Sequence, residues 1–235
     1  MIPREPRRED VRTRSVQGFT TTFYVCCNPP RPNTFVFSAP VEGRYLGWHA
    51  AALGYDGFLR WAYDAWPADP VRDARHRLWP AGDCFLVYPG GYSSIRFEKL
   101  REGIVDFEKI RILRDVASRS SNGNAHSLMK KLEAHLDGLP AESDYSKRDY
   151  DVPKLREAVH KGGQLIETLS DELGLRTGSP AARTDARPAD RSDAAARPII
   201  SSGNVDMVFP GSPGPQRHRS RRVSRVLAWS PRWRT

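Results

Sequence analysis

The sequence predicts an α/β fold, namely a partial (β/α)8 TIM barrel that comprises its last three strands and helices. Three short stretches enriched in aromatic and β-branched residues are typical of strands: Phe19–Cys27, Phe58–Tyr63 and Asp83–Tyr88. Amphipathic segments alternate with these stretches, which is the pattern of a parallel sheet covered by helices. A full barrel needs about 250 residues, so we expect five of its strands to be missing from this chain.

Residues 1–17 form a basic leader that we expect to be disordered. The leader is rich in arginine and contains no apolar run, so it is not a secretory signal as it stands. The cytoplasm is therefore the default location, and secretion would apply if a missing N-terminus carried a signal peptide. The sequence contains no run of about 20 apolar residues, so no membrane span is predicted.

The first predicted strand, Phe19–Cys27, is followed by a stiff turn rich in proline. Asn28 lies just past this strand, at the end that faces the active site in an α/β barrel. Asn28 is therefore a candidate site residue, and the alternative is an Asx turn that leads into the prolines. The segment Pro40–Leu53 then predicts a helix, in which His49 is more simply a packed residue than a ligand.

Alternation along the second predicted strand separates two sets of side chains. One set is apolar enough to lie beneath a helix, and the other contains Arg60 and Asp64, which fit an interior polar site at the strand end. The following loop, which contains Trp66, is long, and long loops on rigid scaffolds often carry function. The third strand, Asp83–Tyr88, is almost continuously apolar, as a strand buried on both faces would be.

A long amphipathic helix is predicted after the serine pair at 93–94, either of which can cap it. Its apolar stripe has spacings of three and four residues and consists of Phe97, Leu100, Ile104, Phe107 and Ile110. The charged residues between them, Arg96 included, indicate a solvated face, and the alternative is a buried pair between Arg101 and Asp106. Gly103 costs a helix about 1 kcal/mol, which suggests close packing at that position.

Two additional helices are predicted within residues 118–175, after a barrel-like domain of residues 18–117. Leucines recur at four-residue spacing within residues 124–137. A second helix opens at Asp151-Val152-Pro153, with proline in its first turn, and Gly174 ends it. These helices would pack on the barrel wall or form a hairpin.

The segment 176–235 is predicted to be a disordered basic tail, because its composition is polar and its periodicity is lost. It contains 12 Lys and Arg against 4 Asp and Glu, a net charge of +8, whereas the whole chain carries +9. The basic character therefore belongs to the tail. Arg217–Arg225 is a patch that could bind nucleic acid, but a solvated tail is the simpler interpretation.

Three cysteines, Cys26, Cys27 and Cys84, are best interpreted as small buried apolar side chains. Neighbouring cysteines seldom bond to each other, and no CxxC spacing indicates zinc. A nucleophilic thiol would need a histidine beside it, and the sequence ties none to a cysteine. No metal cluster, phosphate loop or nucleotide fingerprint is present, so no metal and no cofactor are expected.

Several segments together resemble one known family. The runs DGFLRWAYDAW, WPAGDCFLVYPG and SSIRFEKLREGIVDFEKIRIL, in this order and spacing, resemble the end of the catalytic domain of glycoside hydrolase family 123. The upstream run FYVCCNPPRPNTFVFSAPVEGRYLGWHAAALGYDG continues the resemblance. It covers roughly residues 18–115.

The resemblance implies hydrolysis of N-acetyl-β-galactosaminides by a substrate-assisted mechanism, in which the acetamido oxygen of the substrate attacks the anomeric carbon. An adjacent Asp-Glu pair serves this mechanism, with Asp orienting the acetamido group and Glu as general acid and base. The adjacent acidic pairs of this chain, Glu9-Asp10 and Asp171-Glu172, do not follow a buried strand. No catalytic residue is therefore assigned, and we expect the chain to be inactive alone.

The resemblance implies that this chain retains one side of the substrate-binding site, which could bind a glycan containing N-acetylhexosamine. Aromatic rings at strand ends can stack on a sugar, and neighbouring polar groups can bond its hydroxyls. The candidates are Trp61, Tyr63, Asp64, Trp66 and Tyr88, with Arg60 and Asn28 behind them. Core packing is the alternative role of the two tryptophans. The second hypothesis for function is a non-catalytic module that binds carbohydrate or interacts through its basic tail.

Overall fold

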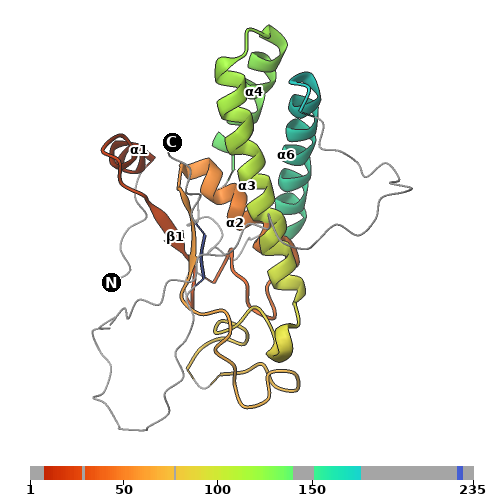
Figure 1. The fold of residues 1–235 in the computed structure, drawn as a ribbon. Coiled ribbons are helices and arrows are strands. Elements are labelled where there is room, and N and C mark those ends of the chain that lie inside the picture. The colour runs from red at the N-terminus through yellow and green to blue at the C-terminus, as the bar shows by residue number, and fades with distance from the viewer. Residues whose placement is uncertain (1–7, 28–29, 77, 140–150, 176–226, 230–235) are drawn as a thin grey trace, which may run out of the picture.

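The computed structural model describes residues 8–27, 30–76, 78–139, 151–175 and 227–229. The fold is a helix-rich α/β arrangement in which helices pack against a small sheet (Figure 1). The elements in chain order are α1 (Arg8–Val16), β1 (Thr22–Tyr24), α2 (Pro40–Leu53), β2 (Gly57–Arg60), the 3-10 helix η1 (Pro89–Gly91), α3 (Ile95–Arg119), α4 (Gly123–Asp137), α6 (Val152–Glu172) and β3 (Leu227–Trp229).

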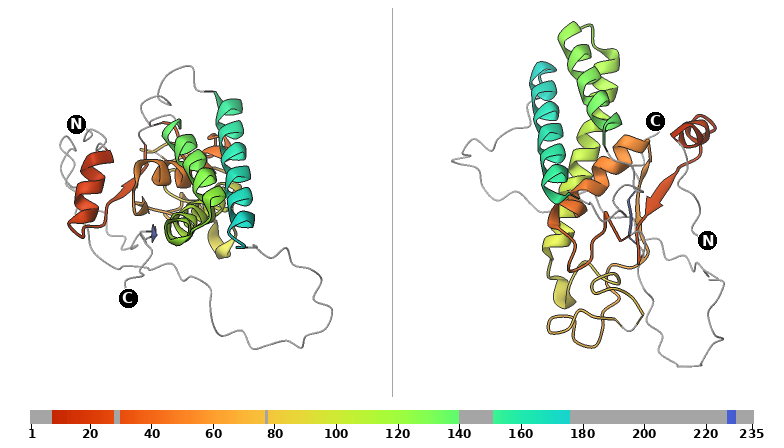
Figure 2. Two further views of the ribbon diagram at one scale, coloured as in Figure 1. Left: turned by 90° about the horizontal axis from the view of Figure 1, so that it is seen from above. Right: turned by 180° about the vertical axis from the view of Figure 1, so that it is seen from behind.

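The sheet has the order β1-β2-β3. Strands β1 and β2 are parallel and are joined through α2, with Phe23 opposite Phe58. Because the strands are parallel, their carboxyl ends lie at the same edge. The loops that follow β2 gather at one end of the molecule, away from α4, in both the front and rear views (Figures 1 and 2).

The prediction of a third parallel strand at Asp83–Tyr88 is wrong. This stretch consists of turns and two isolated antiparallel bridges, Asp64 to Phe85 and Tyr88 to Tyr92. Its residues 83–86 are buried, as expected, but arginine side chains and not a neighbouring strand bind several of its carbonyl oxygens. The strand beside β2 is instead β3, which is antiparallel.

The predicted helices are confirmed. Helix α2 spans the predicted residues, and Ser94 caps α3 by accepting a hydrogen bond from the Phe97 backbone N–H at 3.1 Å. Asp151 caps α6 in the same way through Lys154, and Gly174 follows the helix with a φ of 67°. These ends form as predicted because short polar side chains satisfy the first free N–H groups of a helix.

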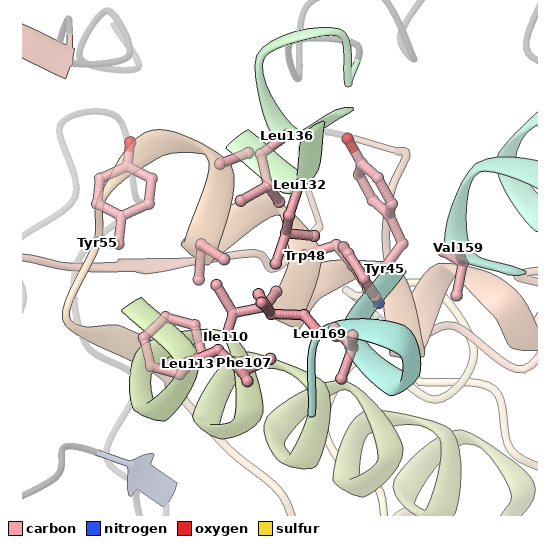
Figure 3. Packing of buried hydrophobic residues seen from close by; sticks show 14 of the residues in the cluster. Tyr45, Trp48, Tyr55, Phe107, Ile110, Leu113, Leu132, Leu136, Val159 and Leu169 are labelled. Atoms are coloured by element: carbon pink, nitrogen blue, oxygen red, sulfur yellow. The ribbon is translucent and has the colours of Figure 1, made fainter. Parts of the chain in front are cut away.

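The main hydrophobic core lies between α2, α3, α4 and α6 (Figure 3). Trp48 of α2 is fully buried at its centre, and its indole N–H donates to Asp106 at 2.8 Å. Arg44 also binds the Asp106 carboxylate, at 2.6 Å. The alternative pairing of Asp106 with Arg101 is therefore wrong, because Arg101 binds Glu98.

Helices α2 and α3 approach closely at two glycines. A Cβ atom on Gly47 would lie 1.9 Å from the Gly103 carbonyl oxygen, and a Cβ on Gly103 would lie 2.3 Å from the Arg44 carbonyl oxygen. The predicted close packing at Gly103 is therefore confirmed, and it explains a residue that otherwise weakens a helix.

The N-terminal leader departs from the prediction of disorder. Residues Arg8–Val16 form helix α1, and Val11 joins the main core. Arg8 also contacts Asp137 at the end of α4. The prediction rested on charge, which does not reveal that a single valine can anchor a polar helix. Residues 1–7 lie outside the described part of the chain.

Residues Leu227–Trp229 correct the prediction for the tail, because they pair with β2. The remainder of the tail, including the basic patch Arg217–Arg225, lies outside the described residues. Among the helices that the structure describes, none is long and apolar enough to cross a membrane.

Alanine substitutions at two adjacent glycines of α6 should change the stability of the protein in opposite directions. A Cβ on Gly162 would lie 2.4 Å from the Trp48 ring, whereas a Cβ on Gly163 would meet nothing nearer than an Arg44 nitrogen at 3.9 Å. We expect Gly162→Ala to destabilise the protein by about 1–3 kcal/mol, and Gly163→Ala to stabilise it by roughly 0.5–1 kcal/mol. Urea unfolding of both variants measures the two changes, and equal shifts would contradict this packing of α6 on Trp48.

Candidate functional site

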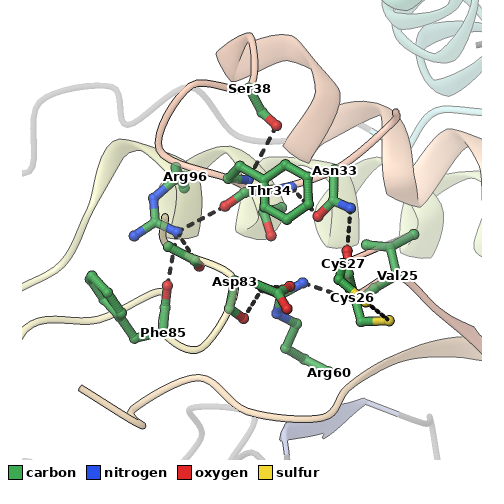
Figure 4. A network of polar contacts seen from close by, with 12 residues as sticks. Val25, Cys26, Cys27, Asn33, Thr34, Ser38, Arg60, Asp83, Phe85 and Arg96 are labelled. Carbon is green, nitrogen blue, oxygen red and sulfur yellow. Dashed lines mark hydrogen bonds and ion pairs between the residues drawn. The ribbon is translucent and has the colours of Figure 1, made fainter. Parts of the chain in front are cut away.

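Arg60 ends β2 and ties three segments together at the carboxyl edge of the sheet (Figure 4). Its Nη1 donates to the Val25 carbonyl oxygen at 3.0 Å, which lies just beyond β1. Its Nη2 donates to both the backbone carbonyl and the carboxylate of Asp83, the latter at 3.2 Å. Both charged side chains are fully buried, so this pair organises the loops and does not face solvent.

Burial dominates the electrostatics of the Arg60–Asp83 pair. It lowers the pKa of Arg60, although the charge of Asp83 opposes the shift. It also raises the pKa of Asp83, against the attraction and the hydrogen bond of Arg60. Charges removed from water are costly to keep unless each has a partner. Each member of the pair therefore depends on the other.

Arg96, in the first turn of α3, likewise binds backbone carbonyl oxygens of these loops. Its Nη1 donates to the carbonyl oxygens of Thr34 at 2.8 Å, Gly82 at 2.9 Å and Phe85 at 2.8 Å. The guanidinium carbon lies 5.1 Å from the centre of the Phe85 ring. The predicted solvated position of Arg96 is wrong, because only 9% of the residue is exposed.

Glu42 holds the loop between β1 and α2. Its carboxylate accepts the backbone N–H groups of Asn33 and Ala39, each at 2.9 Å. Asn33 in turn donates from its amide to the Cys26 carbonyl oxygen at 2.6 Å. Burial raises the pKa of Glu42, while these two N–H groups favour its charged form and oppose the shift. The loops of β1 and β2 are thus fixed by buried side chains.

Several predicted binding residues lie on the segments that this framework supports. The Tyr63 backbone carbonyl oxygen accepts the Leu86 backbone N–H at 2.8 Å, and the Asp64 backbone forms an isolated bridge with Phe85. The indole N–H of Trp66 donates to the Val87 carbonyl oxygen at 2.7 Å. The two loops that carry these residues therefore lie side by side.

The aromatic candidates are half-buried, and two of them make edge contacts with other rings. Trp61 packs against Trp79 with ring centres 5.7 Å apart, and Tyr88 packs against Phe85 at 5.3 Å. Trp61, Tyr63, Asp64, Trp66 and Tyr88 all keep an intermediate exposure. A partly exposed ring that is fixed by its neighbours can stack on the apolar face of a sugar.

Two predicted site residues differ from this group. Arg60 is fully buried and bonded to the protein, so it lies behind the surface and does not itself face a ligand. Asn28 lies outside the described residues. Sequence reasoning missed the structural roles of Glu42 and Arg96, and the available signal was that each charge sits beside residues of an apolar helical face.

The acidic pairs lie away from the strand ends. Glu9 and Asp10 are exposed in α1, which precedes β1. Asp171 and Glu172 are exposed around the end of α6, where Glu172 accepts a hydrogen bond from Asn122 at 2.8 Å. Neither pair is therefore positioned at the carboxyl edge of the sheet, where the loops of β1 and β2 meet.

The cysteines fit their predicted burial only in part. Cys84 is buried, and burial raises the pKa of its thiol to about 11. Cys26 is half-buried and Cys27 is exposed, with 3.7 Å between their sulfur atoms. In the part of the chain that the structure describes, no group of three or more His, Cys, Asp or Glu residues could hold a metal ion.

A cavity of about 530 Å³ lies between α4 and α6, remote from the loops of β2. His135 lines it, with Nε2 2.9 Å from the Ala158 carbonyl oxygen. Burial lowers the pKa of His135, the bond to Ala158 opposes this shift, and the charge of Lys161 lowers the pKa further. The folded protein therefore favours the neutral imidazole.

The lowered pKa of His135 predicts a loss of stability in acid. As the pH falls through 6.5, the unfolded chain takes up a proton on this histidine before the folded protein does, so the free energy of unfolding decreases. His135→Gln should make this pH dependence shallower between pH 7 and pH 5. Urea unfolding across that range measures the effect, and the exposed His160→Gln serves as the control. Parallel stability curves for His135→Gln and the parent would contradict the assignment.

Comparison with known proteins relates this arrangement to one family. The model of the glycoside hydrolase 123 catalytic domain matches residues 2–113, just under half of the chain. A solved family 123 glycoside hydrolase from Clostridium perfringens, studied for glycolipid glycan hydrolysis, has a TM-score of 0.55 and 24% identity. A search of curated proteins gave no match.

The similarity to the solved structure covers 72% of this chain and 30% of the Clostridium perfringens chain. This chain therefore spans about 30% of the length of that relative. Coverage of 72% exceeds the segment matched by the family model, so the likeness of fold extends past residue 113. Residues 2–113 thus match the model of the glycoside hydrolase 123 catalytic domain, and the fold of the chain is similar to that of a solved member of family 123.

Proposed function

We propose that this chain forms part of the substrate-binding wall of a family 123 glycosidase-like domain and binds glycans with a terminal N-acetyl-β-galactosamine. The observation that carries the proposal is the family match over residues 2–113. The relative from Clostridium perfringens is described as acting in glycolipid glycan hydrolysis, so the glycan of a glycolipid is the substrate class we propose.

The arrangement of the first elements supports a place in a barrel. The order β1, α2, β2, α3, with β1 and β2 parallel, is the repeating unit of a (β/α)8 barrel. Substrates of barrels bind at the carboxyl ends of the strands. The loops after β1 and β2, which Arg60 and Arg96 hold in position, follow those ends. Antiparallel β3 departs from the barrel pattern.

The chemistry of the loops after β2 suits a sugar. Trp66 offers a ring bonded to Val87 of the neighbouring loop, and Tyr88 offers a ring packed on Phe85 of its own loop. Asp64 offers a half-buried carboxylate. Rings would stack on the C–H face of a pyranose, and the carboxylate would accept hydrogen bonds from its hydroxyls. Arg60 acts as a positioning residue behind this surface.

We propose binding without hydrolysis by this chain. A substrate-assisted reaction needs a carboxylate to orient the acetamido group and an acid to protonate the leaving oxygen. The exposed pairs Glu9–Asp10 and Asp171–Glu172 lie in helices away from the loops of β2. We therefore propose no catalytic role for either pair.

A chromogenic N-acetyl-β-galactosaminide tests the catalytic part of the proposal. We expect no turnover above the buffer rate from the purified chain. Turnover that Asp64→Asn abolishes, with binding retained, would contradict this expectation and make Asp64 a catalytic residue. The exposed Asp69→Asn, from the same loop, is the control for nonspecific effects.

Binding of the methyl β-glycoside of N-acetylgalactosamine tests whether the proposed wall binds a sugar. We expect Trp66→Ala and Tyr88→Ala each to weaken binding at least tenfold by calorimetry, because each removes a stacking ring. Tyr92→Ala should leave binding unchanged, since this exposed ring is not among the candidates. Equal binding by all three variants would contradict the proposed wall.

A further inference from the structure

One edge of strand β2 pairs with a strand that lies far away in the sequence. On one side β2 pairs with β1, and on the other Phe58 lies opposite Trp229, Leu59 opposite Ala228 and Arg60 opposite Leu227. A strand edge carries N–H and C=O groups that need partners when they are shielded from water. Gly57, Phe58 and Arg60 are buried, so the β2 edge needs such a partner.

In a barrel, the next strand along the chain would pair with this edge, but the segment at that place cannot do so. Residues 83–88 follow β2 along the chain, but Arg60 and Arg96 bind the carbonyl oxygens of Asp83 and Phe85 and hold them in turns. Their bridges run to Asp64 and Tyr92 and not to β2. The edge is therefore left to β3.

Strand β3 is short and is connected through a long stretch of chain. It has three residues, so it contributes few ladder hydrogen bonds. Residues 176–226 lie between the end of the described helical part and β3, which is a connection of 51 residues. A strand tethered through so many intervening residues has only a modest effective concentration at the edge. Another strand can compete with it.

We propose that residues 227–229 act as a removable cap on the β2 edge, and that release of the cap lets two copies of this chain pair through β2. The β2 edge already accepts an antiparallel strand. Antiparallel pairing of β2 with its own copy satisfies a two-fold axis, which is the commonest symmetry of dimers. The cap thus keeps the edge from self-association, as natural sheets do with exposed edges.

A cross-link in the full chain tests where the cap sits. Residues directly opposite in an antiparallel pair have Cα atoms roughly 4.5–5.5 Å apart, within the range of a disulfide. We expect Leu59→Cys/Ala228→Cys to form a disulfide within one chain on mild oxidation, identified by mass spectrometry of peptides. Leu59→Cys/Ser224→Cys, four residues out of register, should form little. Equal yields from both pairs, or a link joining two chains, would overturn the proposal.

Proline substitutions in the full chain test the consequence of releasing the cap. Successive N–H groups of a strand point to opposite sides, so Leu227→Pro/Ala228→Pro removes a ladder bond whichever residue donates it. We expect light scattering to show a mass that rises toward twice the monomer as concentration increases. Val223→Pro/Ser224→Pro should stay monomeric. A monomeric cap variant, or one whose helical circular dichroism is lost, would overturn the proposal.

Discussion

Replacing Arg60 with methionine is expected to lower the free energy of unfolding by about 3–5 kcal/mol. The substitution removes the donors that reach Val25 and Asp83, and it leaves the Asp83 carboxylate buried without its cationic partner. Methionine keeps a long apolar stem, so loss of volume contributes little to the result. Urea unfolding with the parent protein as reference measures the change.

Two further variants identify the cause of that loss. Arg72→Met, in the loop after β2, removes a side chain that is 88% exposed and should change stability by less than about 0.5 kcal/mol. Adding Asp83→Asn to Arg60→Met should recover part of the loss, because a buried neutral amide costs less than a buried unpaired charge. A loss below about 1 kcal/mol for Arg60→Met would contradict the role given to the arginine.

Gly47→Ala is expected to be the most damaging small substitution in the helices, with a loss of about 3 kcal/mol or more. Its Cβ would lie 1.9 Å from the Gly103 carbonyl oxygen, so α2 and α3 would have to move apart. The obstacle is backbone and cannot change rotamer. The usual gain of roughly 1 kcal/mol from alanine in a helix is too small to offset it.

Gly43→Ala is the matched control on the same helix. Its Cβ would approach the Arg96 carbonyl oxygen to 3.3 Å, which requires a shift of only tenths of an ångström. We expect a change within about 1 kcal/mol of zero, as helix propensity and mild crowding oppose each other. Similar unfolding midpoints for the Gly43 and Gly47 variants would contradict the close approach of α2 and α3.

Local patterns predicted the helices well because their determinants lie within each segment. Apolar spacing and a capping serine defined α3, and proline and glycine defined the ends of α6. Alternation along β2 also placed Arg60 at an interior polar site, but it put the other set of side chains beneath a helix, whereas Phe58 of the Arg60 set is buried against α2 and α3. Each of these inferences needed only neighbours within a few turns or a few residues.

The errors concern partners that are distant in sequence. A buried apolar run such as Asp83–Tyr88 has the same composition whether a strand or two guanidinium groups bind its carbonyl oxygens. Likewise, the alternative pairing gave Asp106 a partner on its own helix, Arg101, but its partners, Arg44 and Trp48, lie on α2. Strand β3 pairs with a segment more than 160 residues away, and no local pattern reveals such a partner.

The central claim is that the loops after β2 form a glycan-binding wall, and nuclear magnetic resonance of the tryptophan indoles tests it most directly. Titration with the methyl β-glycoside of N-acetylgalactosamine should shift the indole signals of Trp61 and Trp66, which are half-buried on those loops, and leave that of the buried Trp48 in place. Signals that do not move at millimolar ligand, or shifts confined to Trp48, would contradict the claim.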